Sequence, residues 1–460
     1  MKYIDGSFLN SAISFNNPFN DIALIHNWIK EQNKKINVNI DRITFDEMLN
    51  WQFRDNCNTL EHTTGNFFSI VGINIETNYG EIYNWEQPII NQPEIGYLGF
   101  IVKEFNGVLH FLIQAKIEPG NVNYVQLSPT LQATKSNYNQ AHKGKKPAYL
   151  EYFVNASPNQ ILLDQLQSEQ GGRFLKKRNR NIIIKVDSDI ELYDNFIWMT
   201  LAQIKEMMRY DNIVNMDTRT VISGIPFEED CIKEDIGNIF LQSLKIDGKD
   251  LHHFDHLLHY ITRRKVAYSL EVNKVPLANL RNWVIEDSQI KHIENKFFKV
   301  IATRVSIDNR EVSSWCQPMI QPAQEGICAF ICKEINGKIH FIVQIKLEAG
   351  NFDILELAPT VQCLTGNYRS SGINSLPFLD YVLNVSSDKV VYDTLQSEEG
   401  GRFYKEQNKN LLILANKDEF TDDLPENYIW MSFSQLIMFL KFNNYLNIQS
   451  RSLLAAINFI

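Results

Sequence analysis

The sequence Leu166-Gln167-Ser168-Glu169-Gln170-Gly171-Gly172-Arg173-Phe174 occurs a second time, with one change, as Leu395-Gln396-Ser397-Glu398-Glu399-Gly400-Gly401-Arg402-Phe403. Two adjacent glycines are costly to order, and they allow the backbone to bend or a ligand to approach closely. Carboxylates on one side and an arginine on the other suit a polar or phosphorylated ligand better than a buried core. Because a simple turn does not require the same nine residues twice, this segment points to a duplicated chain.

Further matches extend on both sides of the Gly-Gly segment. The positions differ by 230 for most pairs, by 229 at the Gly-Gly segment, and by 232 at the helices and at the pair Trp51 and Trp283. An offset this constant indicates a tandem duplication, and its period is too long for a solenoid. We therefore predict an α+β fold with two homologous domains, 1–225 and 226–460, joined near residues 222–250. The matching pairs include Trp85-x-Gln87-Pro88 with Trp315-x-Gln317-Pro318, Asn106-Gly107 with Asn336-Gly337, Pro129-Thr130 with Pro359-Thr360, and Asn137-Tyr138 with Asn367-Tyr368.

Local patterns predict individual elements in each half. An Asn-Gly pair between apolar runs is typical of a hairpin, and Thr200 with Gln203 forms a capping box that begins a helix. Pro88 excludes a central strand at its position. The predicted elements are a loosely held arm at 1–20, helices at 22–30 and 45–53, strands at 67–73 and 181–186, hairpins at 106–107 and 336–337, and helices that begin at Thr200 and Ser432.

Composition places the chain among folded globular proteins. The apolar fraction is 44% and the aromatic fraction 12%, while the net charge of −9 argues against nonspecific nucleic-acid binding. The six cysteines form no C-x-x-C pair, so we expect reduced structural thiols. The group at His252, His253, His256 and His259 lacks an H-E-x-x-H pattern, and we expect no metal site there.

The chain shows no signal for export or for membrane insertion. Its first residues contain no apolar core of a secretory signal. We find no apolar run near the roughly 18 residues of a spanning helix. We therefore expect a cytoplasmic protein.

The second strand of each hairpin suggests where chemistry takes place. Between Val108 and Glu118, side chains that alternate in a strand put an apolar set on one face and Gln114, Lys116 and Glu118 on the other. Two interpretations are open: an antiparallel strand with one face in water, or a cleft that holds a base, an oxyanion partner and an orienting amide. The same polar order recurs in the second copy as Gln344, Lys346 and Glu348.

Other candidates also have two interpretations. The basic loop from His142 to Lys146 suits a phosphate or is a solvated loop. Tryptophans at 51, 85, 283 and 315 suit stacking on a base or sugar, or are core residues. The chain contains no P-loop, no G-x-G-x-x-G after a strand and no G-x-S-x-G, so ATP hydrolysis, nicotinamide redox and serine hydrolysis lack their usual signatures.

These motifs together resemble the NDP-hexose 2,3-dehydratase family. The resemblance is carried by Gln114-Ala115-Lys116-x-Glu118-Pro119-Gly120-Asn121, the Pro-Thr-x-Gln pairs, Ser136-Asn137-Tyr138 and the Gly-Gly segments, and it covers nearly the whole chain. It implies action on dTDP-4-keto-6-deoxy-glucose in deoxysugar biosynthesis, tandem Nudix-like domains, two nucleotide-sugar pockets per chain, a homodimer and no cofactor. It also implies loss of Nudix hydrolysis, consistent with the lack of a G-x5-E-x7-R-E-x2-E-E-x-G box in the sequence.

The resemblance also implies roles for particular residues. A base removes the C3 proton next to the C4 ketone, a donor stabilises the enolate, and an acid assists departure of the C2 hydroxyl; the product is a 3,4-diketo-2,6-dideoxy sugar. We assign Glu348 or Glu118 as the base, Lys346 or Lys116 to the enolate, and Tyr368 or Tyr138 to the leaving hydroxyl. The residues expected to bind substrate, with the arginines on the diphosphate, are Trp51, Thr134, Lys135, Ser136, Asn137, Arg173, Trp283, Trp315, Gln344, Thr365, Asn367, Arg369, Gln396, Ser397, Glu398, Glu399, Gly400, Gly401 and Arg402.

The sequence leaves open which half is catalytic. Glu398-Glu399 in place of Glu169-Gln170 favours the C-terminal pocket, whereas the basic loop at 142–146 favours the N-terminal one. Rival functions are a nucleotide-sugar epimerase or isomerase, a Nudix-type pyrophosphohydrolase, and a nucleotide-sugar-binding protein without catalysis. The labile diketone product implies a following 3-ketoreductase as a partner.

Overall fold

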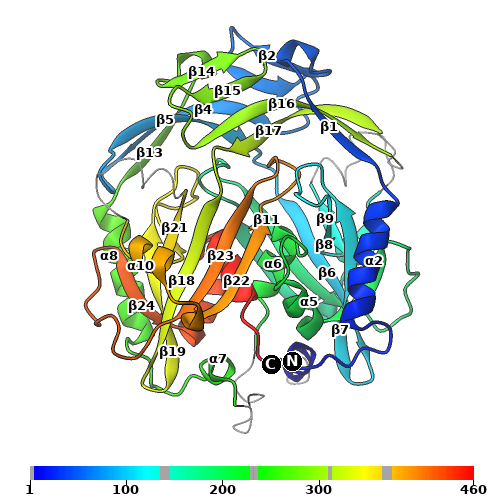
Figure 1. Cartoon of the computed structure of the whole chain (residues 1–460), viewed down its shortest axis with the longest axis vertical. Coiled ribbons are helices and arrows are strands. Elements are labelled where there is room, and N and C mark those ends of the chain that lie inside the picture. Colours follow the sequence, from blue (N-terminus) through cyan, green and yellow to red (C-terminus); the bar gives the residue numbers. More distant parts are fainter. Residues whose placement is uncertain (1–4, 135–145, 228–231, 233–236, 309–312, 365–375) are drawn as a thin grey trace.

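The computed structural model describes residues 5–134, 146–227, 232, 237–308, 313–364 and 376–460. Figure 1 shows two large sheets, with two small sheets beyond them at one end of the long axis. Each repeat contributes one large sheet and most of one small sheet. The predicted α+β fold with two tandem homologous domains, each with a mixed sheet and flanking helices, is confirmed.

The large sheet of the first repeat is mixed. Strand β11 runs parallel to β6, and the other described pairs are antiparallel. The hairpin between β6 and β7 turns at Asn106 and Gly107, whose φ values of 51° and 78° fit the turn that this dipeptide favours. The strands are β6 (Gly96–Phe105), β7 (Val108–Ile117), β8 (Val125–Ser128), β9 (Leu131–Ala133), β10 (Ile161–Ser168), β11 (Arg178–Lys185) and β12 (Phe196–Thr200).

The large sheet of the second repeat has the same topology. Its hairpin turns at Asn336 and Gly337, also with positive φ, and β23 runs parallel to β18. Both predicted hairpins are thus confirmed. The strands are β18 (Gly326–Ile335), β19 (Lys338–Lys346), β20 (Glu356–Ala358), β21 (Val361–Leu364), β22 (Val390–Ser397), β23 (Gln407–Leu414) and β24 (Tyr428–Ser432).

The two small sheets exchange a strand. Strand β1 (Val38–Arg42) of the first repeat pairs with β16 (Phe298–Ile307) of the second, and β13 (Leu270–Val275) of the second repeat pairs with β4 (Ser69–Thr77) of the first. Each small sheet is therefore completed by the other repeat. The remaining strands are β2 (Trp51–Arg54), β3 (Thr59–His62), β5 (Asn84–Asn91), β14 (Trp283–Glu286), β15 (Gln289–His292) and β17 (Ser314–Pro322).

Helices fill the space between the large sheets and cover their edges (Figure 1). The predicted capping boxes are present at Thr200 and Ser432, whose hydroxyls accept hydrogen bonds from the N–H groups of Gln203 and Gln435. The α-helices are α1 (Asp5–Ala12), α2 (Ile22–Lys34), α4 (Leu150–Val154), α5 (Leu201–Met207), α6 (Met216–Ser223), α7 (Ile239–Gln242), α8 (Phe254–Ala267), α10 (Leu379–Asn384), α11 (Phe433–Leu440) and α12 (Ile448–Ala455), and 3₁₀ turns lie at Phe45–Glu47, Pro158–Gln160, Leu277–Asn279 and Ser387–Lys389.

The main core joins the two repeats. Leu109, Phe111 and Ile113 of β7 point into it, as the alternation predicted, together with the corresponding residues of β19. The opposite face of β7 is not in water, because Leu112 is fully buried in a second cluster beneath α4. The interpretation of this strand as having one wet face is therefore wrong.

Three further expectations can be compared with the structure. The arm at 1–20 was expected to be loosely held, but Phe8 on α1 is fully buried against the core. The helix expected at 45–53 is only a 3₁₀ turn at its start, and Trp51 begins a strand. Pro88 lies on β5, whose partner among the described strands is β4 and whose Ile90 also bridges to Phe174, so β5 is an edge strand of its sheet, as the proline required.

Candidate active site

The polar end of β7 forms the centre of a cluster of charged residues. Gln132 Nε2 donates a hydrogen bond of 2.7 Å to Glu118 Oε1, and Lys116 Nζ lies 3.7 Å from the same oxygen. Asn215 in turn donates to Gln132 Oε1 at 3.2 Å, which fixes the orientation of the amide. We call this group cluster 1; its members are Lys116, Glu118, Gln132, Glu169, Asp217, Glu399 and Arg402.

The end of β19 repeats this arrangement. Gln362 Nε2 donates a hydrogen bond of 3.0 Å to Glu348 Oε1, Lys346 Nζ donates to the Gln362 carbonyl at 2.9 Å, and Asn447 orients Gln362. This group is cluster 2; its members, at the corresponding positions, are Lys346, Glu348, Gln362, Glu398, Gln449, Gln170 and Arg173.

In both clusters one carboxylate oxygen is held and the other is left without a partner. Oε2 of Glu118 and Oε2 of Glu348 are buried and accept no hydrogen bond among the described residues. A buried carboxylate oxygen without a donor is costly unless a ligand or a proton satisfies it. This is the arrangement expected of a base held ready for a substrate proton.

The Gly-Gly segments carry residues of one repeat to the cluster of the other. The N–H of Gly120 donates to the Gly400 carbonyl at 2.7 Å, and the Lys405 N–H donates to the Gly120 carbonyl at 2.7 Å. In the other half, Gly350 makes the same pair of hydrogen bonds with Gly171 and Lys176, at 2.7 and 2.8 Å. Each cluster is therefore built from both repeats.

This close crossing explains why glycine is required. A Cβ atom on Gly120 would lie 1.6 Å from the Phe403 carbonyl oxygen, and one on Gly400 would lie 2.2 Å from Asn121 Oδ1. The sequence suggested a bend or a close ligand; among the described residues the close partner is the backbone of the other repeat. The same holds for Gly350, whose Cβ would lie 1.7 Å from the Phe174 carbonyl oxygen.

The crossing of the two segments also decides which cluster contains Glu399, the carboxyl that has an amide as its counterpart. From sequence, Glu399 favoured the C-terminal pocket, but the fold brings Glu399 to Glu118 of the first repeat. The counterpart in cluster 2 is Gln170. The sequence argument for the C-terminal pocket therefore loses its basis.

Burial and like charges raise the pKa of several acids in both clusters. Burial, then the nearby Glu118, raises the pKa of Glu399 to about 7, while burial raises the pKa of Asp217 well above its usual value. Burial, then Glu406, raises the pKa of Glu398 to about 8. The clusters thus hold carboxyl groups that titrate near neutral pH.

Two buried arginines that the sequence interpretation missed hold the Gly-Gly segments in place. Arg219 of α6 donates to the Gln396 side chain and the Ser397 carbonyl, each at 2.6 Å. Arg451 of α12 donates to the Ser168 carbonyl of the other segment. Both residues lie in a repeated stretch with the 232-residue offset, Asn215-Met216-Asp217-Thr218-Arg219 and Asn447-Ile448-Gln449-Ser450-Arg451, which is the signal that could have identified them.

Several predicted substrate-binding residues lie in buried positions. Gln396 and Ser397 are each 1% exposed and bonded to α6 and its flanking loop, and Glu398 accepts a hydrogen bond of 2.6 Å from Asn408. Gln344 is buried on β19, and Thr134 follows β9 and is half-buried. For Gln396 and Ser397 these positions favour a structural role over contact with a ligand.

The two motif arginines lie on aromatic rings. The Arg402 guanidinium is 4.3 Å from the centre of Phe68, and that of Arg173 is 4.1 Å from the centre of Phe298. Each ring belongs to the other repeat, and each arginine also donates to the carbonyl of the glycine before it. Their predicted role in binding a diphosphate stays a prediction.

The tryptophans are tied to the small sheets. Trp51 Nε1 donates to the Cys316 carbonyl at 2.7 Å, and Trp283 Nε1 donates to the Glu86 carbonyl at 2.8 Å, so each bond crosses between repeats. Both rings are buried, which favours the core interpretation. Trp315 is half-buried, and its Nε1 donates a hydrogen bond to Gln317 Oε1. Gln317 Nε2 in turn donates to the Gly401 carbonyl.

The remaining predicted site residues lie outside the described residues. They are Lys135, Ser136, Asn137, Tyr138, Thr365, Asn367, Tyr368 and Arg369.

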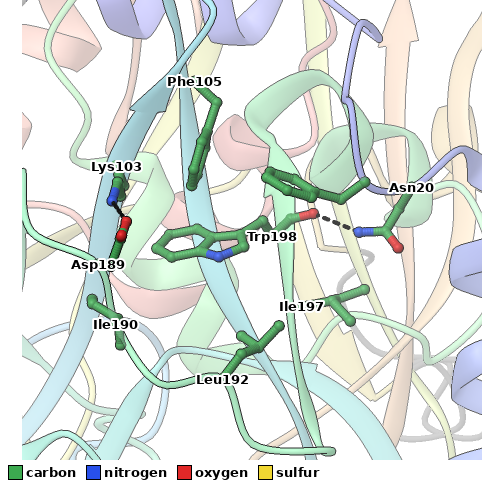
Figure 2. Close-up of a pocket in the computed structure, with 9 residues that line it drawn as sticks. Asn20, Lys103, Phe105, Asp189, Ile190, Leu192, Ile197 and Trp198 are labelled. Carbon is green, nitrogen blue, oxygen red and sulfur yellow. Dashed lines mark hydrogen bonds and ion pairs between the residues drawn. The ribbon is translucent and has the colours of Figure 1, made fainter.

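A pocket of about 280 Å³ is lined by no residue of either cluster, and Figure 2 shows the side chains around it. The Trp198 ring lines it, and Lys103 and Asp189 form an ion pair of 2.7 Å at its edge. Lys103 pairs with His110 of β7. His110 precedes Glu118 by eight residues, which places the pocket roughly 26 Å from Glu118 at the usual rise of a strand. The sequence did not identify this pocket.

Within the described ranges, no three His, Cys, Asp or Glu side chains gather as a metal-binding group. His252 and His256 stack with ring centres 5.0 Å apart. No helix in the same ranges has both the length and the apolar character needed to span a bilayer.

The duplicated α+β fold holds two clusters of acids, amides and amines, which are groups that enzymes use for proton transfer. The chain belongs to the NDP-hexose 2,3-dehydratase family, whose sequence model matches residues 22–225 and 254–457. It is 42% identical to the dTDP-4-dehydro-6-deoxy-alpha-D-glucopyranose 2,3-dehydratase of Saccharopolyspora spinosa, over 98% of this chain and 94% of that protein. It is 39% identical to proteins of the same name from Streptomyces violaceoruber (95% and 97% covered) and Amycolatopsis orientalis (94% and 89% covered).

Proposed function

We propose that this protein removes water across C2 and C3 of dTDP-4-keto-6-deoxy-glucose and forms the 3,4-diketo-2,6-dideoxy sugar nucleotide. The names of three relatives support the substrate. The observation that carries the mechanism is the glutamate at each strand end, with one oxygen held by a glutamine and the other buried without a partner.

The substrate dictates the order of events. The hydrogen on C3 is acidic because it lies next to the C4 ketone, so the free carboxylate oxygen of Glu118 or Glu348 removes it. The lysine two residues earlier stabilises the enolate oxygen. Loss of the C2 hydroxyl then gives an enol that becomes the diketone. The overall change is redox-neutral, and each proton transfer by a placed group is worth roughly 10²–10⁴-fold in rate.

The remaining parts of the substrate need their own contacts. We propose that Arg402 and Arg173 face the diphosphate, since each is half-buried and keeps an Nε that has no partner among the described residues. The proposal that Tyr138 or Tyr368 assists departure of the C2 hydroxyl rests on the family resemblance alone.

The test is to incubate the purified protein with dTDP-4-keto-6-deoxy-glucose, with and without EDTA, and to follow loss of water by mass spectrometry. We expect dehydration in both cases. Metal-dependent release of a nucleoside monophosphate would establish a Nudix-type hydrolase instead. Binding of dTDP without consumption of the sugar would establish a binding protein, and a product of unchanged mass an epimerase.

The family resemblance also supports proposals about assembly and setting. We propose two Nudix-like domains with a boundary near residue 225, a homodimer, a cytoplasmic location, and transfer of the labile diketone to a 3-ketoreductase. Light scattering coupled to size-exclusion chromatography tests the dimer.

A further inference from the structure

The carboxyl of Glu399 is positioned by backbone contacts between the two repeats. Its neighbour Gly400 accepts a hydrogen bond from the N–H of Gly120, and the Gly120 carbonyl accepts one from Lys405, both at 2.7 Å. Gly120 lies two residues after Glu118. The segment that carries one carboxyl is therefore fastened to the strand end that carries the other.

Glu399 is the accessible acid of cluster 1. Its Oε1 accepts a hydrogen bond of 3.0 Å from the Gly401 N–H, and no other hydrogen bond reaches the carboxyl among the described residues. Its side chain is half-buried, whereas Glu169 is 7% and Asp217 3% exposed. A substrate beside Glu118 thus meets Glu399 before the other two acids.

The corresponding place in cluster 2 holds an amide. Gln170 precedes Gly171 as Glu399 precedes Gly400, and an amide cannot donate a proton as a carboxylic acid does. Glu356 is an acid near Glu348, but it is 3% exposed and its Oε2 accepts a hydrogen bond of 2.9 Å from Ser168. It is therefore screened from a substrate that is held at Glu348.

We propose that Glu399 is the general acid of the dehydration and Glu118 its base, so that catalysis takes place in cluster 1. This inference rests on the proposed function and adds to it the choice of cluster and of proton donor. The two catalytic carboxyls then come from different repeats, and Lys116 lies on the same side as Glu118 to meet the enolate.

The protons and bonds balance over the cycle. Glu118 takes the proton from C3, and the electron pair of that C–H bond forms the enolate. As the C2–O bond breaks, Glu399 gives its proton to the departing oxygen, which leaves as water. In the tautomerisation that follows, C2 receives a proton from Glu118 and the C3 hydroxyl returns one to Glu399, so both groups recover their starting forms.

The electrostatic surroundings of Glu399 are consistent with its role as the acid. Burial and the charge of Glu118 raise the pKa of Glu399, Arg402 opposes that rise, Glu169 adds to it, and Lys116 opposes it. Two carboxyls that interact in a desolvated site tend to share one proton. Glu399, whose pKa is raised to about 7, is therefore placed to carry the proton.

The test separates removal of the C3 proton from loss of the C2 hydroxyl. Wild type, Glu399→Gln and Glu118→Gln are incubated with substrate in D₂O, and both the product and the deuterium at C3 of recovered substrate are measured. We expect Glu399→Gln to lose roughly 10²–10⁴-fold in turnover while C3 exchange continues, and Glu118→Gln to lose both. Asp393→Asn, a surface carboxyl on β22 that pairs with Lys409, is the matched control and should keep wild-type turnover.

Several results would overturn the proposal. These are turnover within tenfold of wild type for Glu399→Gln, loss of C3 exchange in that variant, or a greater loss from Glu348→Gln than from Glu118→Gln. If Glu399→Gln does not fold, Glu399→Asp takes its place, and turnover equal to wild type across the whole pH range would count against the acid role. Failure of the wild type to release water would instead contradict the proposed function.

Discussion

Clusters 1 and 2 share a lysine, a glutamate and a glutamine in the same geometry, yet they differ in the acids around them. Glu399 and Asp217 in the first cluster correspond to Gln170 and Gln449 in the second. The duplicated site has kept its shape in both copies, but two positions that hold carboxyls in cluster 1 hold amides in cluster 2.

A difference in the opposite direction, with the acid near cluster 2, lies deeper in the fold. Lys177 near cluster 1 corresponds to Glu406 near cluster 2, and both side chains are buried. Burial, opposed by the charge of Arg173, raises the pKa of Glu406 to about 7. Around the half-buried Glu348, the other acids of and near cluster 2, Glu398, Glu356 and Glu406, are buried, whereas beside Glu118 in cluster 1 the second acid Glu399 is half-buried. The number of carboxyls teaches less than their accessibility.

The largest expected effect comes from separating the crossing segments. Gly120→Ala puts a Cβ against the Phe403 carbonyl beside cluster 1, and Gly350→Ala does the same against Phe174 beside cluster 2. Since backbone atoms cannot move aside easily, we expect each variant to lose about 3 kcal/mol or more of stability, measured by chemical denaturation.

The two glycine variants should still differ in activity. In protein that stays folded, Gly120→Ala should abolish turnover and Gly350→Ala should retain some. Gly237→Ala, where a Cβ would meet no atom of the described residues within 4 Å, is the control for stability. Equal residual turnover in the two variants would contradict the difference between the clusters.

The buried arginines give the next largest effect. Arg219→Met removes hydrogen bonds to the segment of Glu399, and Arg451→Met removes those to the segment of Gln170. Loss of charged, buried hydrogen bonds should cost about 3–5 kcal/mol in either variant, seen as a lower denaturation midpoint. We expect kcat to fall more in Arg219→Met than in Arg451→Met. A larger fall in Arg451→Met would contradict the proposed difference between clusters 1 and 2.

A smaller effect should appear in the pH dependence. Since the pKa of Glu399 is raised to about 7, and the protonated form is the one that donates, kcat/KM should fall about tenfold per pH unit above that value. A kcat/KM profile from pH 5 to 9 measures this. A profile that stays flat through pH 8 would mean that no acid of this kind takes part.

The smallest effect tests the tryptophans. Trp51→Phe and Trp283→Phe each remove one hydrogen bond that crosses between repeats, which should cost about 0.5–1.5 kcal/mol. Because the two bonds are alike, the losses should be alike, and KM should change less than twofold. A KM that rises tenfold would instead support the sequence prediction that these rings stack on the substrate.

Local sequence signals predicted much of the fold. The hairpins at Asn106 and Asn336 and the helices that begin at Thr200 and Ser432 depend on neighbouring residues, and the constant offset revealed the duplication. Lys116 and Glu118 were predicted to share a strand face because strand alternation is local as well, and their charged atoms lie 3.7 Å apart; their role as site residues stays a prediction. The helix expected at 45–53 failed because Trp51 belongs to a strand whose partner, rather than its own periodicity, decides its structure.

What the sequence could not provide is contact between distant segments. The exchange of β1 and β13, the arrival of Glu399 at Glu118, and the burial of Gln396 all depend on contacts between segments more than 170 residues apart. The helix α1 was not predicted because it contains few apolar residues. The burial of Phe8 in the core can be recognised only in the folded structure.

The exchanged strands have a consequence for the history of the chain. Because each half completes the other with an edge strand and a crossing turn, neither copy can be discarded once the exchange is in place. A copy released from selection for chemistry is still retained as a necessary part of its sibling. Each repeat supplies one carboxyl to cluster 1, Asp217 or Glu399, and one amide to cluster 2, Gln449 or Gln170, so neither repeat forms a cluster without the other.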